Sequence, residues 1–423
     1  MKPLYFAKAS LHIMAAHELI PHLFRTEYQK ITAVLCRLFG IEHIEIAEDI
    51  TSDAFLQAAE TWGLHGMPEN PTAWLYTVAK NKARNYFRHD AVFKEKIARQ
   101  LKHSIAEAGE IEIDLSPANI RDSQLQMMFA VCHPSIPAEA QIGLALRILC
   151  GFGLDEIASA FLANKETINK RLTRAREKLR LANIPVELPD EDAIHSRLET
   201  VLTTLYLLFN EGYCSQGQDM ILRKDLCLEA MRLALLLTEN QLTNTPEANA
   251  LLSLMCFHAS RFDARIDTNG NAVLYDDQDS SLWNKELIDK GKFFLKQASE
   301  SNIISKYHIE ACIAYWHTQK NDSIHKWESI LQLYNQLLLI EYSPIAALNR
   351  TYALSKTEGK EAAIAAAEKL DLGSHHLYHT LLGNLYTGVD QGKAIHHLQK
   401  AFSLAKSAAD KKTILKQIDA CEA

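Results

Sequence analysis

An acidic stripe marks the segment from Ile46 to Trp62, which has the periodicity of an amphipathic helix. With residues placed at about 100° intervals, Asp49, Asp53 and Glu60 fall within one narrow sector, and Leu56 lies beside them. Carboxylates next to an exposed leucine are typical of a surface that binds a basic protein, although a solvated helix face can carry the same residues. The chemistry expected here is charge-directed binding.

The next segment carries cations and amides on one face. Asn70 and Pro71 form an N-cap residue followed by proline at the first helical position, which predicts a helix over 72–89. Such a face suits contacts with nucleic-acid phosphates and stacking on bases. The competing interpretation is a solvated basic helix in which Trp74 belongs to the core. The candidate nucleic-acid side chains of this face are Trp74, Lys80, Asn81, Arg84, Asn85 and Arg88, whereas Lys82 falls in the apolar arc.

A second basic block follows the pattern of a DNA-binding helix pair. A short helix begins at Leu154, a turn lies at 163–164, and a longer helix begins near Lys165. This order predicts a helix-turn-helix, with a plain αα-hairpin as the alternative. The apolar positions of the longer helix are Ile168, Leu172, Ala175 and Leu179. The candidate groove- and phosphate-contacting residues are Lys165, Glu166, Thr167, Lys170, Arg171, Thr173, Arg174 and Arg176.

Composition favours an all-α protein with several domains. The 423 residues are too many for one typical domain, and a hydrophobic content of 48% fits a folded chain. Proline and glycine are few, with 11 and 16 residues. No apolar run approaches the ~18–20 residues that span a bilayer, and no signal-peptide core is recognisable, so a cytoplasmic location without a membrane partner is expected.

The order of the charges matters more than their total. A net charge of −7 argues against a uniformly basic nucleic-acid binder. Residues 38–79 contain no Lys or Arg, whereas residues 80–102 and 165–180 are mainly basic. This alternation predicts that the acidic and the basic segments have different partners.

Other chemistry has little support in the sequence. The eight cysteines form no CxxC pair and lie in apolar helical patterns, as buried reduced thiols do. His375–His376 and His396–His397 lack partners at metal-ligand spacing and are interpreted as surface helix residues. Neither a nucleophile–base arrangement nor a phosphate-cradling glycine loop is recognisable. We therefore expect no catalytic residue, no metal and no cofactor.

The second half of the chain is expected to be helical, with short helix pairs of about 34 residues near its end. Helices are predicted at 195–209, 222–237, 246–261, 281–299, 306–317, 324–339, 344–355, 360–370, 377–386 and 393–405. Polar residues gather near helix ends at 210–213, Arg223, Asp225, Glu229, Arg232, Arg261 and 276–279. They predict a buried ionic network or ligand pocket, or else ordinary salt bridges and caps. This half either binds a peptide or protein or supports the fold.

The two modules in this order resemble the extracytoplasmic-function (ECF) group of sigma-70 factors. ITSDAFLQAAETW with NPTAWLYTVAKNKARNYFRH resembles the domain that binds the polymerase clamp and melts the −10 element. LDEIASAFLANKETINKRLTRAREKLR resembles the domain that reads the −35 element. PHLFRTEY, RDSQLQMMFAVCHPSIPAEAQIGLALRIL, YLLFNEGYCS, DLCLEAMRLALLL and SPIAALNR are similar to a subgroup with a C-terminal tetratricopeptide-like extension.

The resemblance implies a function for each segment. Asp49, Asp53, Leu56 and Glu60 would contact the β′ clamp of RNA polymerase core, whose β flap is a further expected partner. The polar face at 80–88 would contact −10 promoter DNA, with the loop at 66–69 near a flipped base, and the helix from Lys165 would read the −35 element. Alignment also suggests Met14 as the natural start, which makes residues 1–13 an upstream extension.

The implied domains are region 2 at 14–92, a linker at 93–115, region 4 at 116–182, a helical extension at 183–300 and tetratricopeptide-like repeats at 301–423. The extension would carry a protein or small-molecule regulator. The first alternative is a stand-alone helix-turn-helix regulator with a helical sensor domain, which would not need Asp49 and Asp53. The second is an enzyme in the C-terminal half, for which no constellation of residues is found.

Overall fold

The computed structural model describes residues 16–89, 113–161, 163–213, 220–267, 273, 275–300, 304–370, 372–405 and 408–422. Residues 1–13 and most of the expected linker at 93–115 lie outside the described residues. The elements are helices, which confirms the all-α prediction. Two compact units divide the chain, Met1–Leu207 and Leu208–Ala423. None of the described helices is long and apolar enough to cross a membrane.

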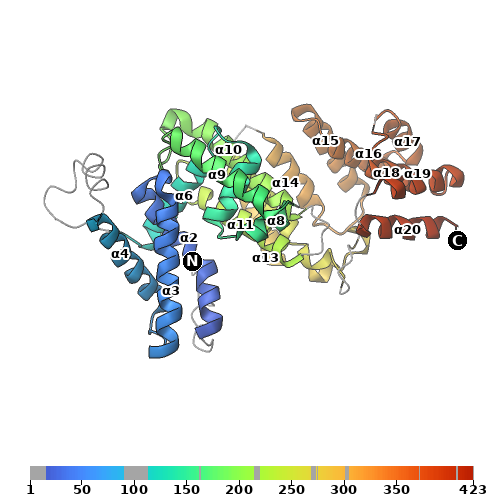
Figure 1. The fold of residues 1–423 in the computed structure, drawn as a ribbon. Coiled ribbons are helices and arrows are strands. Elements are labelled where there is room, and N and C mark those ends of the chain that lie inside the picture. Colours follow the sequence, from blue (N-terminus) through green and yellow to red (C-terminus); the bar gives the residue numbers. More distant parts are fainter. Residues whose placement is uncertain are drawn as a thin grey trace. The chain divides into compact units, whose positions relative to one another are not determined.

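Three helices form the first module of unit 1. They are α2 (Ala16–Phe39), α3 (Ile44–His65) and α4 (Pro71–His89), with the 3₁₀ turn η1 (Ile41–His43) between the first two. Both α2 and α4 pack against α3 (Figure 1). The predicted cap is confirmed, because the side chain of Asn70 accepts a hydrogen bond from the backbone N–H of Ala73 at 3.0 Å. The apolar arc of α4 is buried at Leu75, Ala79, Ala83 and Phe87.

The second module of unit 1 contains α6 (Pro117–Val131), α7 (Ala138–Leu144), the π-helical turn η2 (Ala145–Leu149), α8 (Leu154–Ala160) and α9 (Lys165–Leu181). The side chain of Asn164 caps α9 by accepting from the backbone N–H of Thr167 at 2.7 Å. As the periodicity predicts, Ile168, Leu172, Ala175 and Leu179 of α9 are buried.

The two modules pack on each other within unit 1, where α2 contacts α6. The Arg37 guanidinium donates to the Asn119 side chain at 2.8 Å. Gly151 has a positive φ of 74°, and a Cβ there would collide with the Gln29 side chain, so only glycine suits this close approach. The first half of α10 (Glu191–Tyr213) joins the second module, because Arg197 donates to the carbonyl of Phe129 and Thr204 to the side chain of Gln141.

Unit 2 is a series of helices, each packed on the next. They are α11 (Met220–Thr238), α12 (Pro246–Ala259), α13 (Lys285–Ala298), α14 (Lys306–Trp316), α15 (Ile324–Ile340), α16 (Pro344–Thr357), α17 (Lys360–Ala367), α18 (His376–Tyr386), α19 (Gln391–Leu404) and α20 (Ala408–Glu422). Each helix predicted for this half is present, and α20 is additional. The helix predicted at 281–299 starts later, since the side chain of Asn284 caps the backbone N–H of Leu287.

Candidate nucleic-acid and protein interfaces

The acidic stripe lies on the outer face of α3. Asp49, Asp53, Leu56 and Glu60 are all exposed, and the Leu56 residue keeps 57% of its surface accessible. The opposite face is buried at Ala47, Ile50, Ala54 and Ala58. An exposed leucine among carboxylates gives a docking partner an apolar contact within a negative field.

Asp53 also has a partner inside the protein. Its carboxylate lies 3.3 Å from the ammonium group of Lys82, on α4. Lys82 was the single cation that the helical pattern put in the apolar arc, and the ion pair with α3 accounts for its position. Because the Asp53 side chain is 61% exposed, this pair contributes little to stability and can exchange partners.

The polar face of α4 presents Asn81, Asn85 and Arg88 to solvent, with Lys80 and Arg84 half-buried. Trp74 is half-buried as well, and its ring meets that of Trp62 edge-on at 5.4 Å and 67°. Trp74 is therefore partly a core residue, because one edge packs on the module, and partly a surface residue, because the rest of the ring remains accessible for stacking on a base. The Arg84 Nε is buried and has no hydrogen-bond partner among the described residues. Because Arg84 is only half-buried, the accessible part of its guanidinium can still contact a phosphate or base.

One tyrosine joins α4 to α2 beneath this face. The Tyr76 hydroxyl donates to the Glu27 carboxylate at 2.6 Å, and Glu27 also pairs with Lys30 at 2.8 Å. Burial and the Glu27 carboxylate both raise the pKa of Tyr76 far above its ordinary value, so its hydroxyl remains a donor. This contact fixes the rotation of α4 and thereby the direction of its polar face.

On α9, six of the predicted DNA-contacting side chains point outward, whereas two do not. The six exposed residues are Lys165, Glu166, Thr167, Lys170, Thr173 and Arg174. Arg171 is half-buried, with its guanidinium carbon 5.8 Å from the centre of the Phe161 ring. Arg176 faces the first module, where its guanidinium lies 3.2 Å from the Glu48 carboxylate of α3. Lys165 pairs with Asp155 of α8 at 2.8 Å.

Sequence reasoning missed Glu48 as a key residue. Its side chain is only 13% exposed, and its carboxylate receives Arg147 at 3.4 Å in addition to Arg176. On α3, Glu48 lies between the buried Ala47 and the exposed Asp49, at the edge of the acidic stripe. The hint in the sequence was weak, since a glutamate at the edge of an acidic stripe is normally taken as part of its solvated face.

Comparison with known proteins shows which family the helices α2 to α4 resemble. Residues 23–92 match sigma-70 region 2, and this match spans most of α2 and all of α3 and α4. The chain belongs to the sigma-70 family. Region 2 points to an RNA polymerase sigma factor acting in transcription initiation, with core polymerase and promoter DNA as partners.

Two further matches extend beyond region 2 of this sigma-70 protein. Residues 197–299 match a family of unknown function (DUF6596), and this match spans most of α10 and the helices α11 to α13. An uncharacterized protein of Rhizobium meliloti (strain 1021) is 35% identical over 385 residues, which cover 89% of this chain and 90% of that protein. No solved structure matches the chain.

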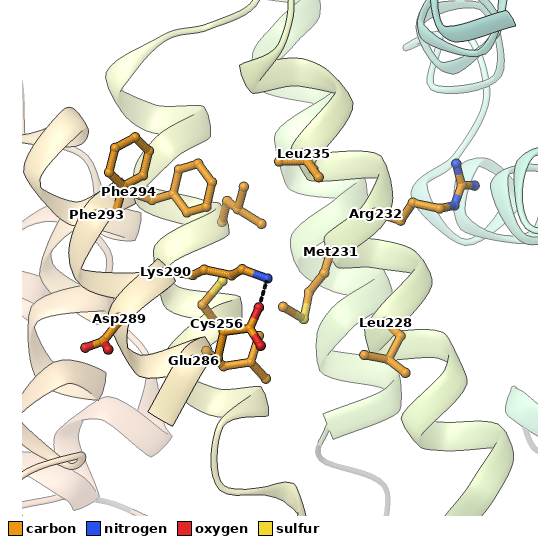
Figure 2. A pocket seen from close by; sticks show the side chains of 12 residues that line it. Leu228, Met231, Arg232, Leu235, Cys256, Glu286, Asp289, Lys290, Phe293 and Phe294 are labelled. Carbon is orange, nitrogen blue, oxygen red and sulfur yellow. Dashed lines mark ion pairs between the residues drawn. The ribbon is translucent and has the colours of Figure 1, made fainter. Parts of the chain in front are cut away.

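Unit 2 of this sigma-70 protein contains an apolar pocket of about 550 Å³. Its walls are α11, with Leu228, Met231 and Leu235, and α13, with Phe293 and Phe294 (Figure 2). Its charged lining includes Arg232, Asp289 and an ion pair at 2.7 Å between Glu286 and Lys290 of α13. The volume is in the range that accommodates a small molecule.

The polar residues predicted near helix ends divide into separate groups. Arg232 pairs with Glu229 along α11 at 2.8 Å. Tyr213 lies with Arg261, whose guanidinium approaches the Tyr213 hydroxyl at 3.5 Å. The side chain of Arg223 lies outside the described residues. The salt-bridge alternative is confirmed for Arg232 and Glu229, whereas Arg261 is buried without an ion pair to a described residue and so forms no ionic network there.

The interpretation of the histidine pairs as surface residues was wrong for most of them. His397 is half-buried, its ring stacks on that of Tyr386 at 5.7 Å, and its Nδ1 lies 3.0 Å from Nδ1 of His379. His375 and His376 are also half-buried, and only His396 is exposed. Packing between α18 and α19 covers part of His397, and His376 lies 3.5 Å from Asp410 of α20, contacts that helical spacing alone did not indicate. Among the described residues, no group of three His, Cys, Asp or Glu side chains is placed to hold a metal ion.

Proposed function

We propose that this sigma-70 protein is an ECF-type sigma factor that directs core polymerase to promoters with −35 and −10 elements. One observation carries the proposal: within the region 2 match, an exposed acidic stripe on α3 adjoins a separate face of cations and amides on α4. The stripe binds the β′ clamp through Asp49, Asp53, Leu56 and Glu60. The face on α4 binds −10 DNA through Trp74, Lys80, Asn81, Arg84, Asn85 and Arg88.

The second module supplies −35 recognition in this proposal. Helices α8 and α9 are the two parts of a helix-turn-helix, with α9 entering the major groove. Its six outward residues contact bases and phosphates directly. Arg171 and Arg176 join them only when their contacts to Phe161 and Glu48 are exchanged for DNA. The β flap of the polymerase is a further partner of this module.

Unit 2 regulates these two activities. Its successive helices form a tetratricopeptide-like surface for a protein partner, and its apolar pocket is sized for a small ligand. The R. meliloti relative matches this chain over 385 residues, so unit 2 belongs with the sigma modules. The protein acts in the cytoplasm with the polymerase. The domains follow the boundaries implied by the resemblance, except that residues 183–207 belong with unit 1.

In vitro transcription tests the proposal. Core polymerase with the full chain should initiate at promoters that core alone does not use, and Asp49→Lys with Asp53→Lys should abolish this activity. Polymerase-dependent initiation that survives both substitutions would refute the proposal and favour a stand-alone regulator, which does not need Asp49 and Asp53. The regulatory role of unit 2 is tested by truncating the chain after Tyr213, which should change promoter activity in the same assay. Truncation after Ala182 is less suitable, because it also removes the contacts of Arg197 and Thr204 within unit 1.

A further inference from the structure

Three cations in unit 2 surround the ring of Tyr275. The Arg261 guanidinium carbon lies 5.3 Å from the ring centre, the Lys320 ammonium 5.3 Å and the Lys326 ammonium 5.1 Å. Lys326 is only 1% exposed and Arg261 is 8% exposed, whereas Lys320 is exposed. Concentrating positive charge in an enclosed place costs free energy unless acceptors or anions compensate it.

The two lysines have their acceptors inside the protein. The Lys326 ammonium donates to the Tyr275 hydroxyl at 3.0 Å and to the Gln319 carbonyl at 2.6 Å. The Lys320 ammonium donates to three backbone carbonyls, those of Tyr275, Asp276 and Gln278, at 2.9–3.1 Å. These oxygens are neutral, so they satisfy the hydrogen bonds and leave the charge uncompensated.

Arg261 is different, because its guanidinium lacks acceptors. The residue is 8% exposed, and the Tyr213 hydroxyl at 3.5 Å is its only hydrogen-bond partner within the described part of unit 2. Its Nε is buried without a partner, and none of the described carboxylates lies within ion-pair distance. Arg265 adds a further positive charge, with its guanidinium carbon 3.9 Å from the centre of the Tyr213 ring.

Two histidines complete the cluster. His258 lies against Tyr213, with ring centres 4.4 Å apart, and His317 against Tyr275 at 5.2 Å. The Nδ1 atom of each is enclosed and has no hydrogen-bond partner in the described structure. Burial and the neighbouring Arg261 lower the pKa of both rings, so both are neutral and each Nδ1 donates to an anion in the tautomer that carries its proton there.

The nearby carboxylates compensate this charge only in part, because Asp276 and Asp322 favour the charged form of Lys326 but neither is in an ion pair with Arg261. Asp276 is exposed, and Asp322 is 63% exposed and already accepts from Trp327 and Lys356. The cluster of Arg261, His258 and His317 therefore combines three enclosed nitrogens without hydrogen-bond partners in the described structure and an incompletely compensated positive charge. Water would satisfy the nitrogens and leave the charge, whereas an anion with several oxygens would satisfy both.

We propose that Arg261, His258 and His317 form a binding site for a small oxyanion, a phosphate or carboxylate group carried by a regulatory ligand of unit 2. Guanidinium matches the paired oxygens of both groups. A ligand that binds only the folded state raises its stability in proportion to the logarithm of its concentration above Kd. Through this site unit 2 would respond to the concentration of a small ligand, independently of polymerase or DNA.

Titration of the full chain tests this proposal. Inorganic phosphate and acetate are added in separate series at constant ionic strength, with chloride as the reference salt. Trp283, whose ring centre lies 6.3 Å from that of Tyr275, gives a fluorescence signal near the site, and thermal unfolding gives a second readout. A saturable response to phosphate or to acetate supports the proposal and identifies the anion. A linear response to all three salts overturns it.

Variants then locate the site. Arg261→Gln should raise the apparent Kd at least tenfold, whereas Arg350→Gln should leave it unchanged, since Arg350 of α16 donates instead to Asn335. Should Arg261→Gln fail to fold, Arg265→Gln replaces it, with an expected severalfold rise in Kd from the lost charge. An unchanged Kd in the folded Arg261 or Arg265 variant would contradict the proposal. Neither polymerase nor promoter DNA enters these measurements, so they are independent of the sigma assignment.

Discussion

Glu48 of α3 binds Arg176 of α9, with the carboxylate 3.2 Å from the guanidinium. This contact links the helix of the acidic stripe to the helix proposed to read the −35 element. Arg147 approaches the same carboxylate at 3.4 Å. In this arrangement Arg176 is not available to DNA, so we infer that it joins the other DNA-contacting residues of α9 only when this ion pair opens.

Replacing Glu48 should loosen the packing of the two modules. In Glu48→Gln, two enclosed guanidinium groups lose their carboxylate, and we expect a loss of about 1–3 kcal/mol in the free energy of unfolding. Chemical denaturation measures this loss, and binding of −35 DNA without polymerase should become tighter. Glu45→Gln, at an exposed position of the same helix, is the control and should change neither quantity. Equal effects from both substitutions would show that Glu48 does not hold the modules together.

Charge reversal on α3 should abolish polymerase binding. Asp49→Lys with Asp53→Lys places two cations against a basic partner, and like charges at an interface cost several kcal/mol. A pull-down with core polymerase should show a loss of at least a hundredfold in affinity. Asp122→Lys on α6 is an equally exposed control and should bind normally. Core binding that survives the double reversal would place the polymerase contact elsewhere.

The outward side chains of α9 should contribute to the salt dependence of DNA binding. If Lys170 contacts a phosphate, Lys170→Ala should reduce the slope of log K against log salt by about 0.9. Fluorescence anisotropy with a −35 duplex at several salt concentrations measures the slope. Lys178 is exposed nearer the end of α9 and outside the proposed contact set, so Lys178→Ala should leave the slope unchanged. If the Lys170 variant has the same slope as the unmodified protein, Lys170 does not contact a DNA phosphate.

Acid should destabilise unit 2 through its buried histidines. Burial, Arg261 and Lys326 lower the pKa of His317 to about 3, whereas the unfolded chain titrates it near 6.5. The unfolded state therefore binds the proton first, and stability falls as the pH drops below about 6.5, by up to about 1.4 kcal/mol per pH unit for one histidine. The fall ends near the folded pKa, and His258 acts in the same direction.

Unfolding measured from pH 7 downward should show a shallower fall in His317→Gln. The control is His65→Gln, at an exposed position at the end of α3, which should reproduce the unmodified profile. Identical profiles for all three proteins would mean that His317 titrates alike in both states.

Local periodicity predicted much of this structure. The exposure of Asp49, Asp53, Leu56 and Glu60 follows from the helical repeat, as does the burial of the apolar positions of α9. Contacts between distant segments could not be predicted in this way. Arg176 has the same outward charge pattern as its neighbours, and only the packing of α9 on η1 and α3 turns it toward Glu48. The acceptor-poor environment of Arg261 likewise arises from segments that meet only in the fold.

The ion pair between Asp53 and Lys82 couples the two surfaces of region 2 in a reciprocal way. A polymerase cation that takes Asp53 releases Lys82, whose charge then adds to the field of α4. By thermodynamic linkage, promoter DNA that attracts Lys82 frees Asp53 for the clamp to the same degree. An exposed pair contributes at most about 1 kcal/mol, so each partner can favour the other by up to about fivefold. Cooperative assembly would thus begin with one lysine changing its carboxylate for a phosphate.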